Sequence, residues 1–135
     1  MPKCILVVDD LPDVRETTQG ILEDEGYVVR SAANKEEALR AITTECIHVA
    51  ILDVRLDEWD EKNRDGLDLM HEINRINPAT AIIILTGYAD VKMVQEALQP
   101  DNEGHRHAFG FLNKSEMDQL VDYVNRAIES NCKLR

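Results

Sequence analysis

Residues 4–10 read Cys-Ile-Leu-Val-Val-Asp-Asp, and this stretch decides the fold. Its apolar part is too short for an ordinary helix but long enough for a strand that is buried on both faces. Two carboxylates follow at once, at Asp9 and Asp10, where their negative charges repel each other. We expect a strand end that keeps both carboxylates ionised to hold a cation.

Later apolar runs also end at polar residues. Residues 49–52 run into Asp53, and residues 82–85 run into Thr86. The last run, residues 109–112, is followed after Asn113 by Lys114. If these runs are parallel strands, their carboxyl ends bring three carboxylates, a hydroxyl and an amine to one edge of a sheet, where ligands bind in such folds.

Segments with helical spacing of apolar residues separate the runs. The pattern predicts strands at residues 3–8, 27–32, 47–52, 80–85 and 108–112. It predicts helices at residues 13–25, 67–76 and 89–98. A further helix is predicted after Asn34, which can cap it, with Glu37 as its third residue, and the last helix is predicted to follow a Ser115 cap and to reach about residue 130. Gly26 is a plausible stop for the first helix. Strands of this kind, alternating with helices, predict an α/β protein whose parallel sheet carries helices on both faces.

Composition narrows the class of protein. With 135 residues, 44% of them hydrophobic and 30% charged, the chain is expected to form a single domain with a core at about residues 3–130. No apolar run approaches the roughly 20 residues that cross a bilayer, and no signal peptide is recognisable, so a cytoplasmic location without membrane contact is expected. The net charge of -11 argues against direct nucleic-acid binding, because phosphates would be repelled. The three cysteines form no CxxC pair and are expected to be reduced thiols.

The residues at the predicted sheet edge suit phosphoryl transfer. Convergence of Asp9, Asp10 and Asp53 would favour a hard divalent cation, of which Mg²⁺ is the common choice. One carboxylate could then attack a phosphoryl donor, while the amine of Lys114 and the hydroxyl of Thr86 meet the charged phosphoryl oxygens. The turn at residues 9–12 contains no glycine, so it is unsuited to cradling a phosphate directly.

With these residues in order, the chain resembles the receiver domains of two-component response regulators, over essentially its whole length. The resemblance implies a flavodoxin-like, doubly wound five-stranded parallel sheet of order 2-1-3-4-5, an order for which the family is a standard example. It also implies that Asp53 is the phosphoacceptor, and that Asp9, Asp10, Asp53 and the backbone carbonyl of Arg55 hold Mg²⁺.

The resemblance assigns further roles. Thr86 matches the switch hydroxyl, Lys114 the family's lysine, and Phe111 the switch aromatic, at a position where tyrosine is commoner. Arg55 and Tyr88 fall at positions that tune hydrolysis of the phosphoryl group, and we expect their bulk to slow it.

The chain also departs from the family pattern. Leu56-Asp57 replaces the usual Met-Pro, the stretch between Asp53 and Gly66 is long and acidic, and residues 99–107 look inserted. Ser115 stands where proline usually follows the lysine, which leaves the peptide geometry at that bond open, since a cis bond without proline costs about 3–4 kcal/mol.

The expected function is therefore a signalling switch and not a metabolic enzyme. A histidine kinase or phosphotransfer protein would supply the phosphoryl group, and a downstream protein or an output domain would read it. A homodimer through the fourth helix, fifth strand and fifth helix is possible. The alternatives are a degenerate receiver that binds partners without phosphorylation and a small Mg²⁺-dependent phosphohydrolase. A flavodoxin-like cofactor binder is disfavoured by the acidic first loop.

Overall fold

The computed structural model describes residues 2–54, 56, 63, 65–87, 92, 94, 95 and 108–133. The helix predicted at 89–98 falls largely outside these residues. Arg55, Tyr88 and the stretch 99–107 fall outside them entirely.

A parallel five-stranded sheet forms the centre of the fold, with the strand order β2-β1-β3-β4-β5. Its strands are β1 Cys4–Val8, β2 Val28–Ala32, β3 Val49–Asp53, β4 Ala81–Thr86 and β5 Gly110–Asn113. Both the parallel sheet and the 2-1-3-4-5 order confirm the expectations from the sequence. The two polar residues Asp53 and Thr86 are the last residues of their strands, because backbone pairing continues through them, from Asp53 to Leu85 and from Thr86 to Asn113.

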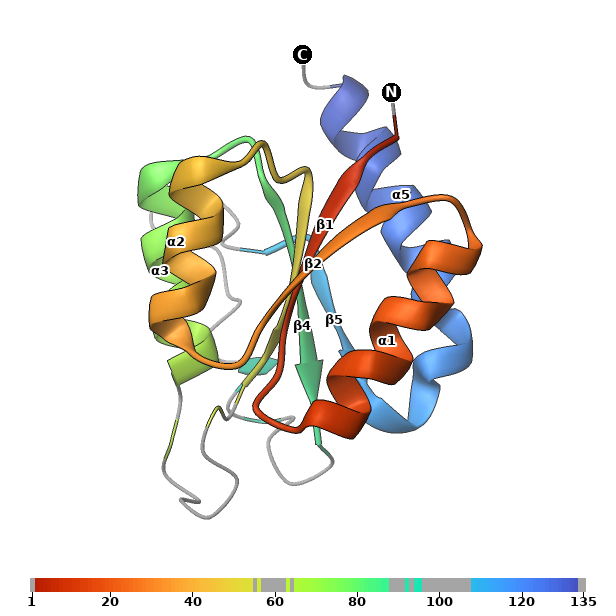
Figure 1. Ribbon diagram of the computed structural model, residues 1–135, viewed down its shortest axis with the longest axis horizontal. Coiled ribbons are helices and arrows are strands. Elements are labelled where there is room, and N and C mark those ends of the chain that lie inside the picture. The colour runs from red at the N-terminus through yellow and green to blue at the C-terminus, as the bar shows by residue number, and fades with distance from the viewer. Residues whose placement is uncertain are drawn as a thin grey trace.

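Helices cover both faces of this sheet (Figure 1). They are α1 Pro12–Asp24, α2 Lys35–Thr44, α3 Asp65–Ile76, the short 3-10 helix η2 Lys114–Gln119, and α5 Leu120–Lys133. Helices α1 and α5 lie on one face, and α2 and α3 lie on the other (Figure 1). Among the described residues, no helix is long and apolar enough to span a membrane.

The core consists of one apolar cluster on each face of the sheet. In β1, Ile5 and Val7 belong to the cluster that includes α5 side chains, whereas Leu6 and Val8 belong to the cluster that includes α3 side chains. Every residue of β3 and β4 is buried. Such strands, apolar on both faces, are what a sheet covered by helices on both sides requires, and they hold the strand ends in fixed register.

Two of the predicted helix boundaries are confirmed by local geometry. Gly26 has φ 93°, a left-handed conformation that glycine adopts without a Cβ penalty, directly after α1. The Asn34 side chain accepts a hydrogen bond from the Glu37 backbone N–H at 2.9 Å and so caps α2.

The predicted Ser115 cap is wrong. Asn113 caps η2 instead, because its Oδ1 accepts hydrogen bonds from both the backbone N–H and the hydroxyl of Ser115, each at 3.0 Å. The Glu116 carboxylate completes a capping box by accepting from the Asn113 N–H at 3.2 Å. The helix α5 then begins only at Leu120, and the Lys114–Ser115 peptide bond is trans, as are the other described peptide bonds.

Candidate functional site

Three aspartates meet at the carboxyl edge of the sheet. One carboxylate oxygen from each of Asp9, Asp10 and Asp53 lies within 4.8 Å of the others. Neighbouring strands bring them together, since Val8 pairs with Leu52 and the aspartates follow directly. Asp9 and Asp53 are 1% and 4% exposed, so the charges of both carboxylates are shielded from most of the solvent.

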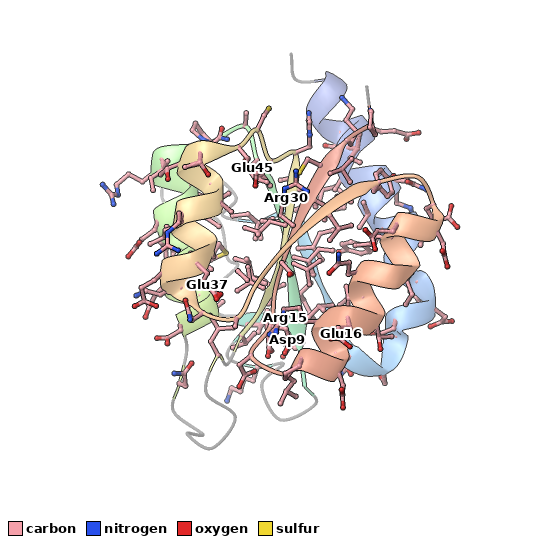
Figure 2. The ribbon with its side chains drawn as sticks, in the orientation of Figure 1. Asp9, Arg15, Glu16, Arg30, Glu37 and Glu45 are labelled. Atoms are coloured by element: carbon pink, nitrogen blue, oxygen red, sulfur yellow. The ribbon has the colours of Figure 1, made fainter. Side chains whose placement is uncertain are left out.

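Asp9 is held at several atoms. Its Oδ1 accepts a hydrogen bond from the Leu11 backbone N–H at 3.0 Å, and its backbone carbonyl accepts one from Arg15 Nη1 at 2.8 Å. Figure 2 shows Asp9 and Arg15 beside each other at the end of the sheet opposite to the Arg30–Glu45 ion pair. The Oδ2 of Asp9 is buried and accepts no hydrogen bond from the described residues. The ammonium of Lys114 lies 3.8 Å from it.

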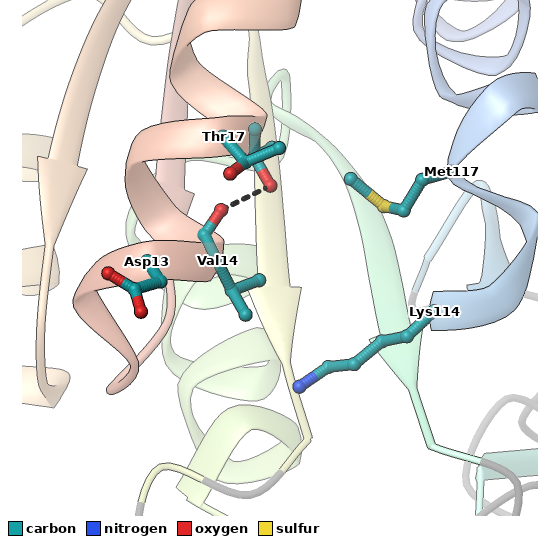
Figure 3. Close-up of a pocket in the computed structure, with 6 residues that line it drawn as sticks. Asp13, Val14, Thr17, Lys114 and Met117 are labelled. Carbon is teal, nitrogen blue, oxygen red and sulfur yellow. Dashed lines mark hydrogen bonds between the residues drawn. The ribbon is translucent and has the colours of Figure 1, made fainter.

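Lys114 brings a positive charge to the acidic group from the other side. Its Nζ lies 3.2 Å from Asp53 Oδ2. The side chain extends from the start of η2 toward the strands and forms one wall of a cavity of about 260 Å³ (Figure 3). Val14, Thr17 and Met117 supply most of the other walls. This lysine therefore contacts two of the three carboxylates and is reachable from solvent.

The electrostatics of the site oppose the ionised form of the two buried carboxyls. Burial, followed by the negative charge of Asp9, raises the pKa of Asp53 from 3.8 to about 7, and Lys114 opposes that rise. Burial likewise raises the pKa of Asp9, while the Leu11 N–H and the Lys114 charge pull it back. One nearby ammonium therefore does not fully compensate the acidic group.

A divalent cation fits this donor set. The carboxylate oxygens gather closely enough to share one ion, and the buried Oδ2 of Asp9 has a vacant acceptor position. Hard oxygen ligands of this kind suit Mg²⁺. The carbonyl of Arg55, which the sequence adds to this set, lies outside the described residues and stays a prediction.

The two predicted switch residues lie on β4 and β5. Thr86 is fully buried, and its hydroxyl donates to the Gly87 carbonyl at 3.0 Å. Phe111 is partly buried and packs against the cluster that contains the α3 side chains. On the other side of β5, the Tyr123 hydroxyl is hydrogen-bonded to the Phe111 backbone, and its ring stacks edge-on against Phe109 at a centroid distance of 5.3 Å.

The sequence reasoning missed two residues that support the site. Arg15 lies within the predicted helix at 13–25 and has no further role there, although its side chain donates to the Asp9 carbonyl. Gly66, in the first turn of α3, lies so close to β3 that an added Cβ would stand 1.9 Å from the Asp53 carbonyl oxygen. Its N–H donates to the Val54 carbonyl at 2.9 Å. The signal for Gly66 was its place directly before the predicted helix at 67–76, after a polar stretch of sequence, since glycine is unfavourable in a helix unless its small size is needed.

Comparison with known proteins identifies the family to which the chain belongs. The family model described as the response regulator receiver domain matches residues 5–125. The chain therefore belongs to the receiver domains of two-component response regulators. Members of this family are signalling phosphoacceptors and not classical enzymes; they bind Mg²⁺ at an acidic pocket and pair with histidine kinases.

Individual relatives agree with this assignment. The chain is 34% identical to the nitrogen assimilation regulatory protein NtrX of Azorhizobium caulinodans over 93% of this chain and 26% of that protein. It is 27% identical to sporulation initiation phosphotransferase F of Bacillus subtilis, over 93% of this chain and 94% of that protein. The crystal structure of the receiver domain of NtrX from Brucella abortus superposes with a TM-score of 0.79 at 33% identity, covering 93% of this chain and 98% of that one. The chain thus spans about a quarter of the length of the NtrX relative but nearly all of the sporulation protein.

Proposed function

We propose that Asp53 accepts a phosphoryl group and that Asp9, Asp10 and Asp53 hold the Mg²⁺ that assists the transfer. The observation that carries this proposal is the meeting of three carboxylates with one ammonium, 3.2 Å from Asp53, at the carboxyl edge of a parallel sheet. The single ammonium does not balance the negative charges of the three carboxylates, as the raised pKa of Asp53 indicates. A bound cation would balance the carboxylates, and the transferred phosphoryl group would be attracted by that cation and by the Lys114 ammonium.

In this reaction a carboxylate oxygen of Asp53 attacks the phosphorus of the donor. A new O–P bond forms, and the bond from phosphorus to the donor atom breaks, with its electron pair leaving on the donor. The Lys114 ammonium can stay paired with charge throughout, first with the carboxylate and then with a phosphoryl oxygen. When bound, Mg²⁺ supplies positive charge to the phosphoryl oxygens and lowers the repulsion between donor and acidic residues.

The phosphorylated state is proposed to act through a shift between two conformations. Thr86 would donate to a phosphoryl oxygen in place of the Gly87 carbonyl that it now contacts, and Phe111 on the neighbouring strand would follow. The surface formed by the helix predicted at 89–98, β5 and α5 would then change its affinity for a downstream partner or for a second copy of the chain. Arg55 and Tyr88 are proposed to slow hydrolysis.

The donor is proposed to be a histidine kinase or a phosphotransfer protein, and the domain is proposed to catalyse only its own phosphorylation and dephosphorylation. A cytoplasmic location and the absence of direct nucleic-acid contact go with this role. Such a domain turns over no small phosphomonoester, which separates it from a phosphohydrolase.

The test is incubation of the folded chain with acetyl phosphate and Mg²⁺, followed by intact-mass analysis. We expect one phosphoryl group per chain, none when the metal is chelated, and none on Asp53→Asn. Asp68→Asn, on the exposed side of α3, is the matched control and should be labelled like the wild type. A folded wild-type chain that takes up no phosphoryl group, or that rapidly hydrolyses a phosphomonoester substrate, would refute the proposal.

A further inference from the structure

The turn between β1 and α1 carries two of the three acidic residues, so its geometry sets where their carboxylates lie. Leu11 is the N-cap of α1, and its side chain makes no capping hydrogen bond. Pro12 begins the helix and has no N–H to donate. The backbone around the turn is held by the Asp9 N–H, which donates to the Ala32 carbonyl at 3.1 Å, the Leu11 N–H, which donates to Asp9 Oδ1 at 3.0 Å, and the Arg15 N–H, which donates to the Leu11 carbonyl at 3.0 Å.

The Arg15 side chain adds a further hydrogen bond to this turn. It folds back across the first turn of α1, and Nη1 donates to the Asp9 carbonyl at 2.8 Å (Figure 2). This bond joins α1 to the residue that directly follows β1. A hydrogen bond from a charged guanidinium is stronger than one between neutral groups. Since Arg15 is half-buried, the bond is also partly protected from competing water.

We propose that Arg15 is a positioning residue for the acidic cluster: by fixing the Asp9 carbonyl, it holds the Asp9 and Asp10 carboxylates where they can share a divalent cation. The inference rests on the proposed Mg²⁺ site and deepens it. Groups that orient a metal ligand from outside the coordination shell typically contribute about 10–100-fold to metal affinity. Arg15 contacts a candidate ligand residue through its backbone, so its effect belongs near the lower end of that range.

The charge of Arg15 and its positioning role predict opposite changes in Mg²⁺ affinity when the side chain is removed, so the proposal is easy to test. A guanidinium near the site repels Mg²⁺, so its removal would tighten binding if Arg15 acted only as a charge. If Arg15 acts by positioning, its removal loosens binding in spite of the relieved repulsion. The substitution Arg15→Met keeps most of the aliphatic stem and removes both the donor groups and the charge. Arg15→Lys keeps the charge but places it on one ammonium nitrogen at the end of a shorter side chain.

The experiment measures the Mg²⁺ dissociation constant by isothermal titration calorimetry, together with the rise in melting temperature that Mg²⁺ produces. We expect Arg15→Met to bind Mg²⁺ about tenfold more weakly and Arg15→Lys to lie between it and the wild type. Arg126→Met is the matched control, because it removes the same charge from an exposed ion pair with Asp122 on α5 and should leave Mg²⁺ binding unchanged.

The outcomes separate this inference from the proposed function. Equal or tighter Mg²⁺ binding by Arg15→Met, with normal binding by the wild type, overturns the role of Arg15 alone. A wild type that binds no Mg²⁺ overturns both the metal site and this role. Equal loss of melting temperature with and without Mg²⁺, at unchanged affinity, would show that Arg15 only stabilises the fold, and it would also overturn the inference.

Discussion

Replacing Gly66 by alanine tests how closely α3 packs against β3, the strand that ends at Asp53. The new Cβ would stand 1.9 Å from the Asp53 carbonyl oxygen, 2.7 Å from the Asp53 carbonyl carbon and 2.9 Å from the Val54 Cα. All three are backbone atoms, and they have little room to move. Asp53 is paired with Leu85 in the sheet, and the Val54 N–H donates to the Leu85 carbonyl at 3.2 Å. The start of α3 must therefore shift away from the sheet.

Two effects of opposite sign set the change in the free energy of unfolding of Gly66→Ala. Alanine in a helix is favoured over glycine by up to about 1 kcal/mol. An overpacked core site costs about 1–3 kcal/mol and occasionally more, and contacts this short with rigid backbone belong at the upper end. Displacement of the helix also lengthens the hydrogen bond from the Gly66 N–H to the Val54 carbonyl, now 2.9 Å. We expect Gly66→Ala to lower the free energy of unfolding by about 2–3 kcal/mol, after the gain in helix propensity is subtracted.

The assay is urea unfolding of Gly66→Ala beside Gly20→Ala. Gly20 lies in the last half of α1, and an added Cβ there would meet no atom within 4 Å. The same substitution should therefore stabilise the chain at Gly20, by roughly 0.5–1 kcal/mol, and destabilise it at Gly66. Phosphorylation by acetyl phosphate should slow only in Gly66→Ala, since that variant moves the backbone of Asp53. If Gly66→Ala is as stable as the wild type and is phosphorylated at the same rate, the close approach of α3 to Asp53 is refuted.

Three further predictions concern charge and capping. The pKa of Asp53 is about 7 in the folded chain, against 3.8 for an ordinary aspartate. The Asp53 carboxyl therefore stabilises the metal-free protein fully below pH 3.8, and this stabilisation is lost as the pH rises through about 7. Asp53→Asn should weaken this decline, measured by urea unfolding at about pH 5 and about pH 8 without Mg²⁺; an unchanged pH dependence would contradict it. Lys114→Met removes the cation 3.2 Å from Asp53 and should raise the pKa of that carboxyl further, as an NMR titration can measure; a lower pKa would count against the ion pair. Asn34→Ala and Asn113→Ala should each lower the free energy of unfolding by about 1 kcal/mol. Only Asn113→Ala should also slow phosphorylation, because its cap orients the turn of Lys114, and equal phosphorylation rates in the two variants would contradict that role.

The sheet was predictable because its signal is local and repeated. Each strand is a short apolar run, and the predicted strands differ from the observed ones by no more than two residues at either end. Parallel strands then place their carboxyl ends together whatever the details of the loops. Asp9, Asp10 and Asp53 could therefore be expected to meet, and they do. The strand order came from the family resemblance and not from the residues alone.

The supporting contacts were not predictable, because they join residues whose sequence neighbourhood gives no sign of the partner. Arg15 reads as an ordinary polar residue of an amphipathic helix, and its bond to Asp9 depends on how the chain turns between strand and helix. Gly66 reads as a weak helix former, and only the distance to the Asp53 carbonyl explains it. Asn113 and Ser115, which precede the last helix, are both good capping residues, and the choice of Asn113 as the cap of η2 depends on the backbone path after β5.

The central proposal is that the phosphoryl group is transferred to the carboxylate of Asp53. Its most direct test is to phosphorylate the wild-type chain with acetyl phosphate and Mg²⁺, reduce the acyl phosphate with borohydride, and locate the product by peptide mass spectrometry. Reduction converts a phosphorylated aspartate to homoserine, so the proposed function predicts homoserine at position 53 and unchanged aspartate at positions 9 and 10. Homoserine at position 9 or 10, or none at position 53 in a chain that has gained a phosphoryl group, would contradict it.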